Sequence, residues 1–96
     1  MPKKNRRVQR PIAPWFVYIL RCADGSLYTG ITKDVKRRCN QHNDGTASRY
    51  TRSRRPTRLV FKEAHPSRSS ALKREAAIKA MTRREKLALT RLKAKK

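Results

Sequence analysis

The sequence predicts a small α+β domain in which helices flank a three-stranded antiparallel β-sheet. Two short segments rich in aromatic and β-branched residues surround the turn signal Asp24-Gly25, and a third such segment is centred near residue 60. The segments between and after them show helical spacing and capping residues. The expected order is therefore β-β-α-β-α-α, and 96 residues leave room for one hydrophobic core.

The sheet is expected to begin after a basic N-terminal arm. Residues 1–13 carry lysines, arginines and prolines but no acid, which is typical of a disordered basic segment, so the folded domain is expected over residues 14–95. Residues 15–22 read as the first strand and residues 27–31 as the returning strand of a hairpin.

The first helix is expected to follow Thr32, a good N-cap residue, with Asp34 near the positive end of its macrodipole. Four residues recur at the i, i+3, i+4, i+7 spacing of one helical face: Val35, Arg38, Cys39 and His42. The run Asn43-Asp44-Gly45 is expected to end this helix.

The second half of the chain is predicted as a loop, a strand and two helices. Residues 46–56 are expected to form a polar loop around Tyr50, which either stacks a base or anchors the loop. Residues 57–63 read as the third strand and residues 68–80 as the second helix. Thr82-x-x-Glu85 has the pattern of a capping box and predicts the start of the last helix.

The charge of the chain predicts a polyanionic partner. Lys and Arg number 27 against 6 Asp and Glu, a formal net charge of +21, and nucleic acid is the commonest partner of such a protein. We expect DNA, contacted by five arginines of the first helix and the polar loop: Arg37, Arg49, Arg52, Arg54 and Arg55. No apolar run approaches the roughly 20 residues of a membrane span, and no secretory signal is recognised, so a cytoplasmic protein is expected. No protein partner is implied, and the oligomeric state is left open.

Two strand tyrosines are candidates for a shared site, although both could equally be core residues with hydroxyls at its edge. A two-residue hairpin loop would put Tyr18 and Tyr28 on opposite faces of the sheet, whereas a three-residue loop with a bulge would pair Tyr18 with Thr32 and put both rings on one face. A joint role predicts the odd loop. Gly30 serves either close backbone approach or turn geometry.

Three polar residues stand on helical faces where apolar residues are expected. Glu75 lies between Leu72 and Ile78 near the core face, so its carboxylate needs a metal or a cation such as Lys79 at i+4. Arg38 and His42 belong either to a solvated basic helix or to a phosphate site. In a phosphate site, the Arg38 guanidinium would bind two phosphate oxygens and the His42 imidazole would be a hydrogen-bond or proton-transfer partner.

Taken together, these residues resemble the GIY-YIG nuclease superfamily, especially its small single-domain bacterial members of the YhbQ type. Phe16-Val17-Tyr18 stands at the first motif and Tyr28-Thr29-Gly30 at the second. The sequence spacing from Tyr28 to Arg38 and from Arg38 to His42 also fits the family, as does the later helical Glu75. The resemblance therefore covers nearly the whole domain.

The resemblance implies hydrolysis of a nucleic-acid phosphodiester with one divalent metal, Mg²⁺ or Mn²⁺. Glu75 would be the metal ligand, and Tyr18 or Tyr28 would position or deprotonate the attacking water. Arg38 would stabilise charge on the phosphate and His42 would assist proton transfer. With no appended recognition domain, the expected activity is a structure-selective endonuclease for branched or damaged DNA in repair or recombination. The alternative is a non-catalytic module that binds DNA or RNA.

Overall fold

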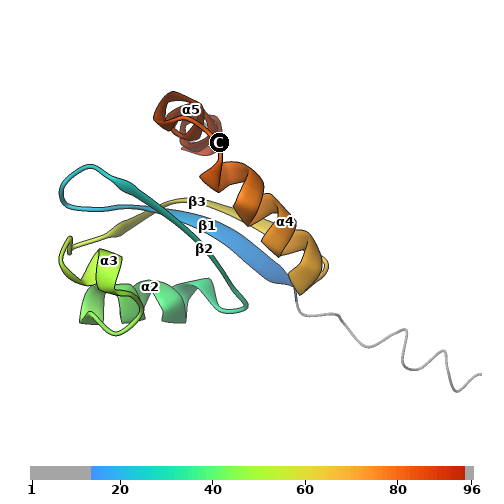
Figure 1. The fold of residues 1–96 in the computed structure, drawn as a ribbon. Helices are drawn as coiled ribbons and strands as arrows, with labels where there is room; N and C mark the ends of the chain where they lie inside the picture. The colour runs from blue at the N-terminus through green and yellow to red at the C-terminus, as the bar shows by residue number, and fades with distance from the viewer. Residues whose placement is uncertain (1–13, 95–96) are drawn as a thin grey trace, which may run out of the picture.

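A three-stranded antiparallel sheet separates two layers of helices (Figure 1). The computed structural model describes residues 14–94, with side chains to residue 91, so the predicted basic arm lies outside the described residues. The strands are β1 (Trp15–Arg21), β2 (Leu27–Thr32) and β3 (Arg58–His65), in the order β2-β1-β3. β1 is therefore the central strand and β2 is an edge strand.

Within residues 14–94, four helices flank the sheet. α2 (Val35–Asp44) and α3 (Arg49–Arg52) lie on one face, whereas α4 (Arg68–Lys79) and α5 (Arg83–Ala94) lie on the other (Figure 1). This arrangement confirms the predicted α+β class and element order, with the one-turn α3 added where a loop was expected. No helix in the described part of the chain is long and apolar enough to cross a bilayer.

The hydrophobic core lies between the sheet and α4. Val17, Ile19 and Phe61 point from alternate strand positions toward Ala71 and Ile78 of α4, and all five are at most 3% exposed. Burying a side chain of the size of valine, isoleucine or phenylalanine contributes about 1.5–3 kcal/mol, so this face of the sheet supplies much of the stability. The opposite face carries the polar residues considered below.

The β1–β2 hairpin has the three-residue loop that a shared tyrosine site requires. The Gly25 amide donates to the Cys22 carbonyl and the Cys22 amide donates to the Ser26 carbonyl, both at 2.9 Å, while Gly25 has a positive φ of 86°. Tyr18 pairs with Gly30 rather than with the predicted Thr32, because the loop begins one residue earlier at Ala23. The parity is unchanged, so the prediction that Tyr18 and Tyr28 share a face is confirmed.

The cap of α2 differs from the prediction. Asp34, not Thr32, is the N-cap, and its carboxylate accepts a hydrogen bond from the Arg37 amide at 3.0 Å. Thr32 remains in β2, where it pairs with Phe16, so helical geometry begins only afterwards.

The caps of the two later helices follow the sequence pattern. Ser67 caps α4 and accepts from the Ser70 amide at 3.1 Å. The capping box before α5 is confirmed, since Thr82 and Glu85 exchange hydrogen bonds between side chain and backbone at 2.9 and 3.1 Å.

Candidate active site

Tyr18 and Gly30 form the floor of the site on the α2 side of the sheet. The Tyr18 side chain is 1% exposed and lies against the Cα of Gly30 on the neighbouring strand. A Cβ at residue 30 would lie 2.6 Å from the Tyr18 hydroxyl oxygen and 2.8 Å from its Cζ atom. Gly30 has no positive φ, so its role is close approach of the phenol rather than turn geometry.

A buried hydrogen-bond chain runs from this phenol into α3. The Tyr18 hydroxyl lies 2.9 Å from Nε2 of His42, and Nδ1 of His42 lies 2.7 Å from the Thr51 hydroxyl. Thr51 is fully buried and in turn lies 2.9 Å from the hydroxyl of Ser48, the N-cap of α3. Both ring nitrogens of His42 are therefore engaged, and the imidazole is fixed in one orientation.

Thr51 was missed by the sequence analysis, which assigned residues 46–56 to a polar loop. The available signal was the three-residue spacing of Ser48 and Thr51, which is typical of a helix N-cap. The Ser48 hydroxyl accepts a hydrogen bond from the Thr51 amide at 3.1 Å. No pattern in the sequence indicated that the Thr51 side chain turns inward to His42.

Burial keeps both members of the Tyr18–His42 pair uncharged near neutral pH. Burial, reinforced by the neighbouring Tyr28, raises the pKa of Tyr18 to about 12, although the Arg38 guanidinium opposes the shift. Burial, and secondarily the positive charge of Arg38, lowers the pKa of His42. This arrangement suits a rigid hydrogen-bonding scaffold better than a pair that exchanges protons with solvent.

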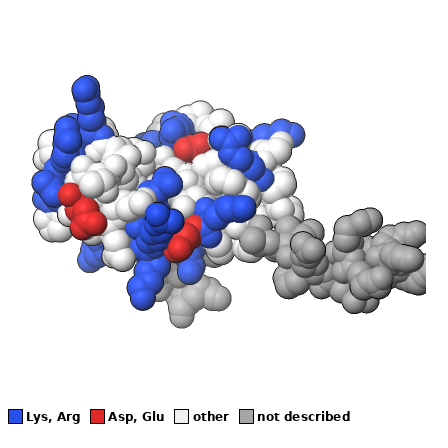
Figure 2. Space-filling model, turned by 90° about the horizontal axis from the view of Figure 1, so that it is seen from below, with Lys and Arg blue, Asp and Glu red and all other residues white. Residues whose placement is uncertain are grey.

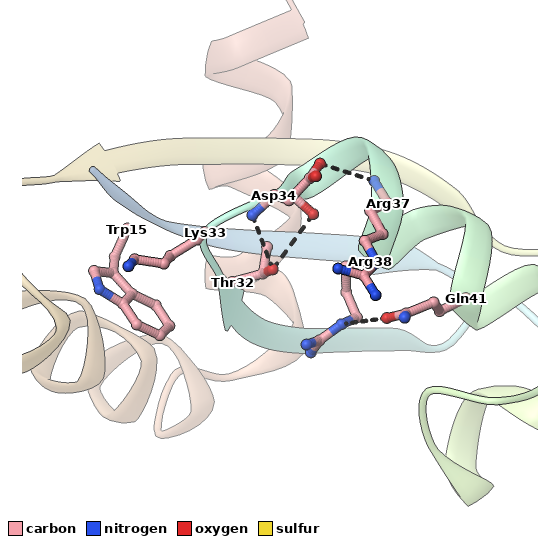
Figure 3. A pocket seen from close by; sticks show the side chains of 7 residues that line it. All are labelled: Trp15, Thr32, Lys33, Asp34, Arg37, Arg38 and Gln41. Atoms are coloured by element: carbon pink, nitrogen blue, oxygen red, sulfur yellow. Dashed lines mark hydrogen bonds between the residues drawn. The ribbon is translucent and has the colours of Figure 1, made fainter. Parts of the chain in front are cut away.

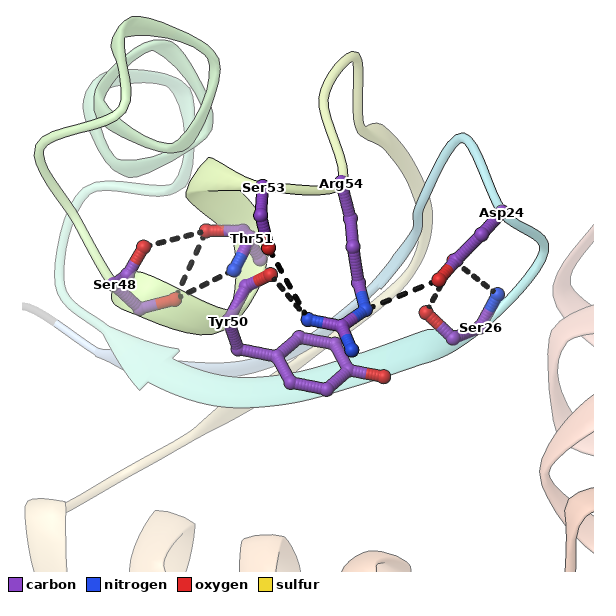
Figure 4. Close-up of polar contacts among 7 residues, drawn as sticks. All are labelled: Asp24, Ser26, Ser48, Tyr50, Thr51, Ser53 and Arg54. Carbon is purple, nitrogen blue, oxygen red and sulfur yellow. Dashed lines mark hydrogen bonds and ion pairs between the residues drawn. The ribbon is translucent and has the colours of Figure 1, made fainter.

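Tyr28 is the more accessible of the two strand tyrosines. Its half-buried ring packs edge-on to His42 with centroids 5.1 Å apart and stacks on Tyr50 at 5.8 Å. The guanidinium carbon of Arg54 lies 3.8 Å from the centre of the Tyr50 ring, and Arg54 also pairs with Asp24 of the hairpin at 3.0 Å (Figure 4). These contacts are those of an anchored loop, with Tyr50 fixed between Tyr28 and Arg54.

Arg38 lines a pocket and also influences the Tyr18–His42 pair. Its Nε donates to the side-chain oxygen of Gln41 at 2.9 Å, and its guanidinium lines a pocket at the start of α2 (Figure 3). Arg38 stands one helical turn before His42 on α2, and its positive charge acts to lower the pKa of both Tyr18 and His42. Arg38 is therefore placed to meet an anion that approaches from the pocket.

Glu75 lies on the other side of the sheet, in α4. Its side chain is 16% exposed, on the helical face that also carries Ala71 and Ile78. Its Oε2 pairs with Nζ of Lys79 at 3.2 Å, the i+4 partner expected from the spacing. None of the hydrogen bonds or ion pairs among residues 14–91 joins Glu75 to the tyrosines, Arg38 or His42.

The residues present fit only a loosely held divalent cation. Within the described residues, no group of three or more His, Cys, Asp and Glu side chains could hold a metal. Mg²⁺ nevertheless keeps several waters and is commonly bound by one or two carboxylates together with substrate phosphate oxygens. A single carboxylate such as Glu75 fits that mode.

The five arginines proposed for DNA contact divide into two groups. Arg54 and Arg55 are engaged within the loop, Arg55 donating to the Arg52 carbonyl at 2.9 Å. The side chains of Arg37, Arg49 and Arg52 are exposed, and no hydrogen bond or ion pair in the described part of the chain involves them. Figure 2 views the face that carries α2 and α3, where lysines and arginines greatly outnumber acids. This face therefore carries an excess of positive charge.

Comparison with known proteins decides the family. The model of the GIY-YIG catalytic domain matches residues 14–88 of this chain. The chain belongs to the GIY-YIG family. That family is a nuclease superfamily, and both of its motif tyrosines lie in the site described above, on adjacent strands.

Its relatives are small bacterial proteins. A UPF0213 protein of Staphylococcus aureus is 54% identical over 74 residues, which cover 77% of this chain and 90% of the relative. The solution NMR structure of a UPF0213 protein from Bacillus halodurans is 48% identical with a TM-score of 0.55, covering 83% of this chain and 85% of that one. A solution NMR structure from E. faecalis is 36% identical with a TM-score of 0.59, covering 86% and 88%.

Proposed function

We propose that this GIY-YIG protein is a divalent-metal-dependent endonuclease that hydrolyses DNA phosphodiester bonds, selects branched or damaged DNA by its structure, and acts in DNA repair or recombination. The observation that carries the proposal is the grouping of Tyr28 and Arg38 around the buried Tyr18–His42 pair, on the side of the sheet where α2 and α3 carry exposed arginines. A phenol and a guanidinium at a phosphate site supply proton transfer and charge stabilisation.

The burial pattern supports different roles for the two tyrosines. Tyr28, which is half-exposed, orients or deprotonates the attacking water. Tyr18 is buried and has a pKa raised to about 12, so it acts as a neutral hydrogen-bonding residue that holds His42 in place. Arg38 stabilises the negative charge that builds on the phosphate oxygens.

Glu75 is the proposed ligand of Mg²⁺ or Mn²⁺. A bound divalent ion would supply Lewis-acid polarisation of the scissile phosphate. α4, which carries Glu75, packs against β1 and β2, and β2 is an edge strand. The proposal requires a phosphate at that edge to meet groups from both faces of the sheet. Lys79, itself exposed, must release the carboxylate for this purpose.

A second candidate is a module that binds DNA or RNA without cleaving it. The ion pair between Glu75 and Lys79 and the exposed Arg37, Arg49 and Arg52 favour this alternative, because neither observation needs chemistry. The two functions differ in their response to metal: cleavage requires it, whereas phosphate contacts depend chiefly on salt.

The test is cleavage of supercoiled plasmid and of a branched oligonucleotide with Mg²⁺, with Mn²⁺ and with EDTA. Wild type should cut only with metal. Tyr28→Phe, which keeps the stacked ring but lacks the hydroxyl, should lose cleavage and retain binding. Binding without cleavage under every condition would replace the nuclease with the binding module.

A further inference from the structure

A pocket of about 330 Å³ opens beside the candidate active site, between the first residue of β1 and the start of α2 (Figure 3). This volume is at the lower end of the roughly 300–1,000 Å³ typical of ligand sites. Its wall combines the Trp15 indole with three cations, Lys33, Arg37 and Arg38. An aromatic surface together with several cations is the combination that binds single nucleotides of a strand.

The pocket and the candidate active site share a residue. Arg38 lines the pocket, and its charge also acts on Tyr18 and His42. A phosphate bound by Arg38 would therefore lie at the junction of the two sites. The pocket is placed to accept the nucleotide next to that phosphate.

The Trp15 ring has two cations near it, both loosely placed. Nζ of Lys33 lies 5.6 Å from the ring centroid and the guanidinium carbon of Arg68 lies 5.7 Å from it. Both distances are near the outer limit of about 6 Å for a cation–π contact. Because Lys33 is exposed and held weakly, a nucleobase can take its place on the indole and leave the ammonium free to meet a phosphate.

The one carboxylate in the pocket wall already serves as a helix cap. Asp34 caps α2 and accepts the Arg37 amide at 3.0 Å. Three cations therefore face one capping carboxylate, and the pocket keeps a net positive charge.

We propose that this pocket is a subsite for one unstacked nucleotide, with its base on Trp15 and its phosphate between Arg37 and Arg38. The position next to the scissile phosphate rests on the proposed nuclease function. A base inside a duplex has both faces covered by its neighbours and cannot lie on the indole. The subsite thus gives a physical reason for preferring DNA with unpaired bases, such as a branch point.

Trp15 is the sole tryptophan of the chain, so its fluorescence reports on the pocket directly. The experiment titrates the full-length protein in EDTA, where no cleavage is expected, with a single-stranded oligothymidylate and with an abasic strand of the same length. We expect quenching by the base-bearing strand and little change with the abasic strand, which offers the same phosphates. Equal responses to the two strands would overturn the subsite.

Variants test the same point by anisotropy of a labelled strand. Trp15→Leu should weaken binding about tenfold, in the range expected for loss of one stacked base, whereas Trp15→Phe should stay close to wild type. Unchanged affinity of a folded Trp15→Leu protein would also overturn the proposal, and if that variant does not fold, the wild-type quenching decides. Quenching by bases without any cleavage in Mg²⁺ would reject the nuclease and leave the nucleotide subsite standing.

Discussion

The phenol of Tyr18 occupies the space above Gly30 that a side chain on the neighbouring strand would fill. A Cβ at residue 30 would approach the Tyr18 hydroxyl oxygen to 2.6 Å and its Cζ atom to 2.8 Å. Tyr18 stands in the first motif of the family and Gly30 in the second. The two motifs are therefore coupled by packing: the glycine of one makes room for the tyrosine of the other, which in turn bonds His42 at 2.9 Å.

Gly30→Ala is expected to displace the Tyr18 ring and break its bond to His42. Overpacking a filled site costs about 1–3 kcal/mol, so the midpoint of urea unfolding should fall by a corresponding amount and cleavage should be lost. A second variant isolates the cause, because Tyr18→Leu removes the ring atoms that a Cβ would strike. In that background Gly30→Ala should cost little. Equal costs in both backgrounds would contradict the coupling.

Thr51→Val should destabilise the protein by about 1–3 kcal/mol although it preserves the shape of the side chain. The substitution leaves Nδ1 of His42 buried without its partner at 2.7 Å, and an unsatisfied buried polar group costs about that much. Chemical denaturation measures the change. Thr46→Val is the matched control, because Thr46 is exposed and should tolerate the substitution. A Thr51→Val protein as stable as the control would exclude a role for this hydrogen bond.

The stability of the protein should fall as the pH drops below about 6.5. His42 has its pKa lowered in the folded state, by burial first and by Arg38 second, so it resists a proton that the unfolded chain accepts near pH 6.5. Its stabilising contribution is full above that pH and is lost as the pH falls toward the lowered value. Denaturant unfolding between about pH 7.5 and about pH 5.5 measures the slope. His42→Gln should flatten the slope, and an unchanged slope in a folded His42→Gln protein would refute the assignment.

Asp24→Asn should tighten binding of nucleic acid while changing stability little. The carboxylate pairs with Arg54 on the surface, where ion pairs contribute little to folding. The substitution removes the charge that neutralises Arg54, whose guanidinium keeps its bond to the Tyr50 carbonyl at 2.9 Å, and it deletes one repulsive charge, so the slope of log affinity against log salt should steepen by about one. Asp44→Asn, at the exposed end of α2, deletes the same charge without removing the partner of an arginine. Equal effects of the two variants would show that only net charge matters.

The sequence predicted the fold well because its signals were local. Hairpin parity, the capping box of α5 and helical spacing each depend on a few neighbouring residues, and the structure bears them out. The cap of α2 was misplaced at Thr32 because strand pairing with Phe16, a long-range contact, decides where β2 ends. Inward rotation of Thr51 and the pocket around Trp15 also depend on distant packing, which no spacing rule encodes.

The candidate site could be predicted in part for the same reason. Tyr18, Tyr28, Arg38 and His42 are joined by one strand pair and one helix, so their spacing was informative. The position of Glu75 relative to them depends on how α4 packs on the sheet, and its pairing with Lys79 was visible only as an i+4 alternative.

The proposed nuclease requires that Glu75 serve as a metal ligand in cleavage and not only as the ion-pair partner of Lys79. The most direct test is single-turnover cleavage of a branched oligonucleotide by Glu75→Gln in Mg²⁺, with binding measured on the same preparation. Glu85→Gln is the control, since glutamine still completes the capping box of α5. We expect a loss of at least about a hundredfold in rate for Glu75→Gln, with binding and stability close to those of the control. Cleavage by Glu75→Gln at the wild-type rate would contradict it.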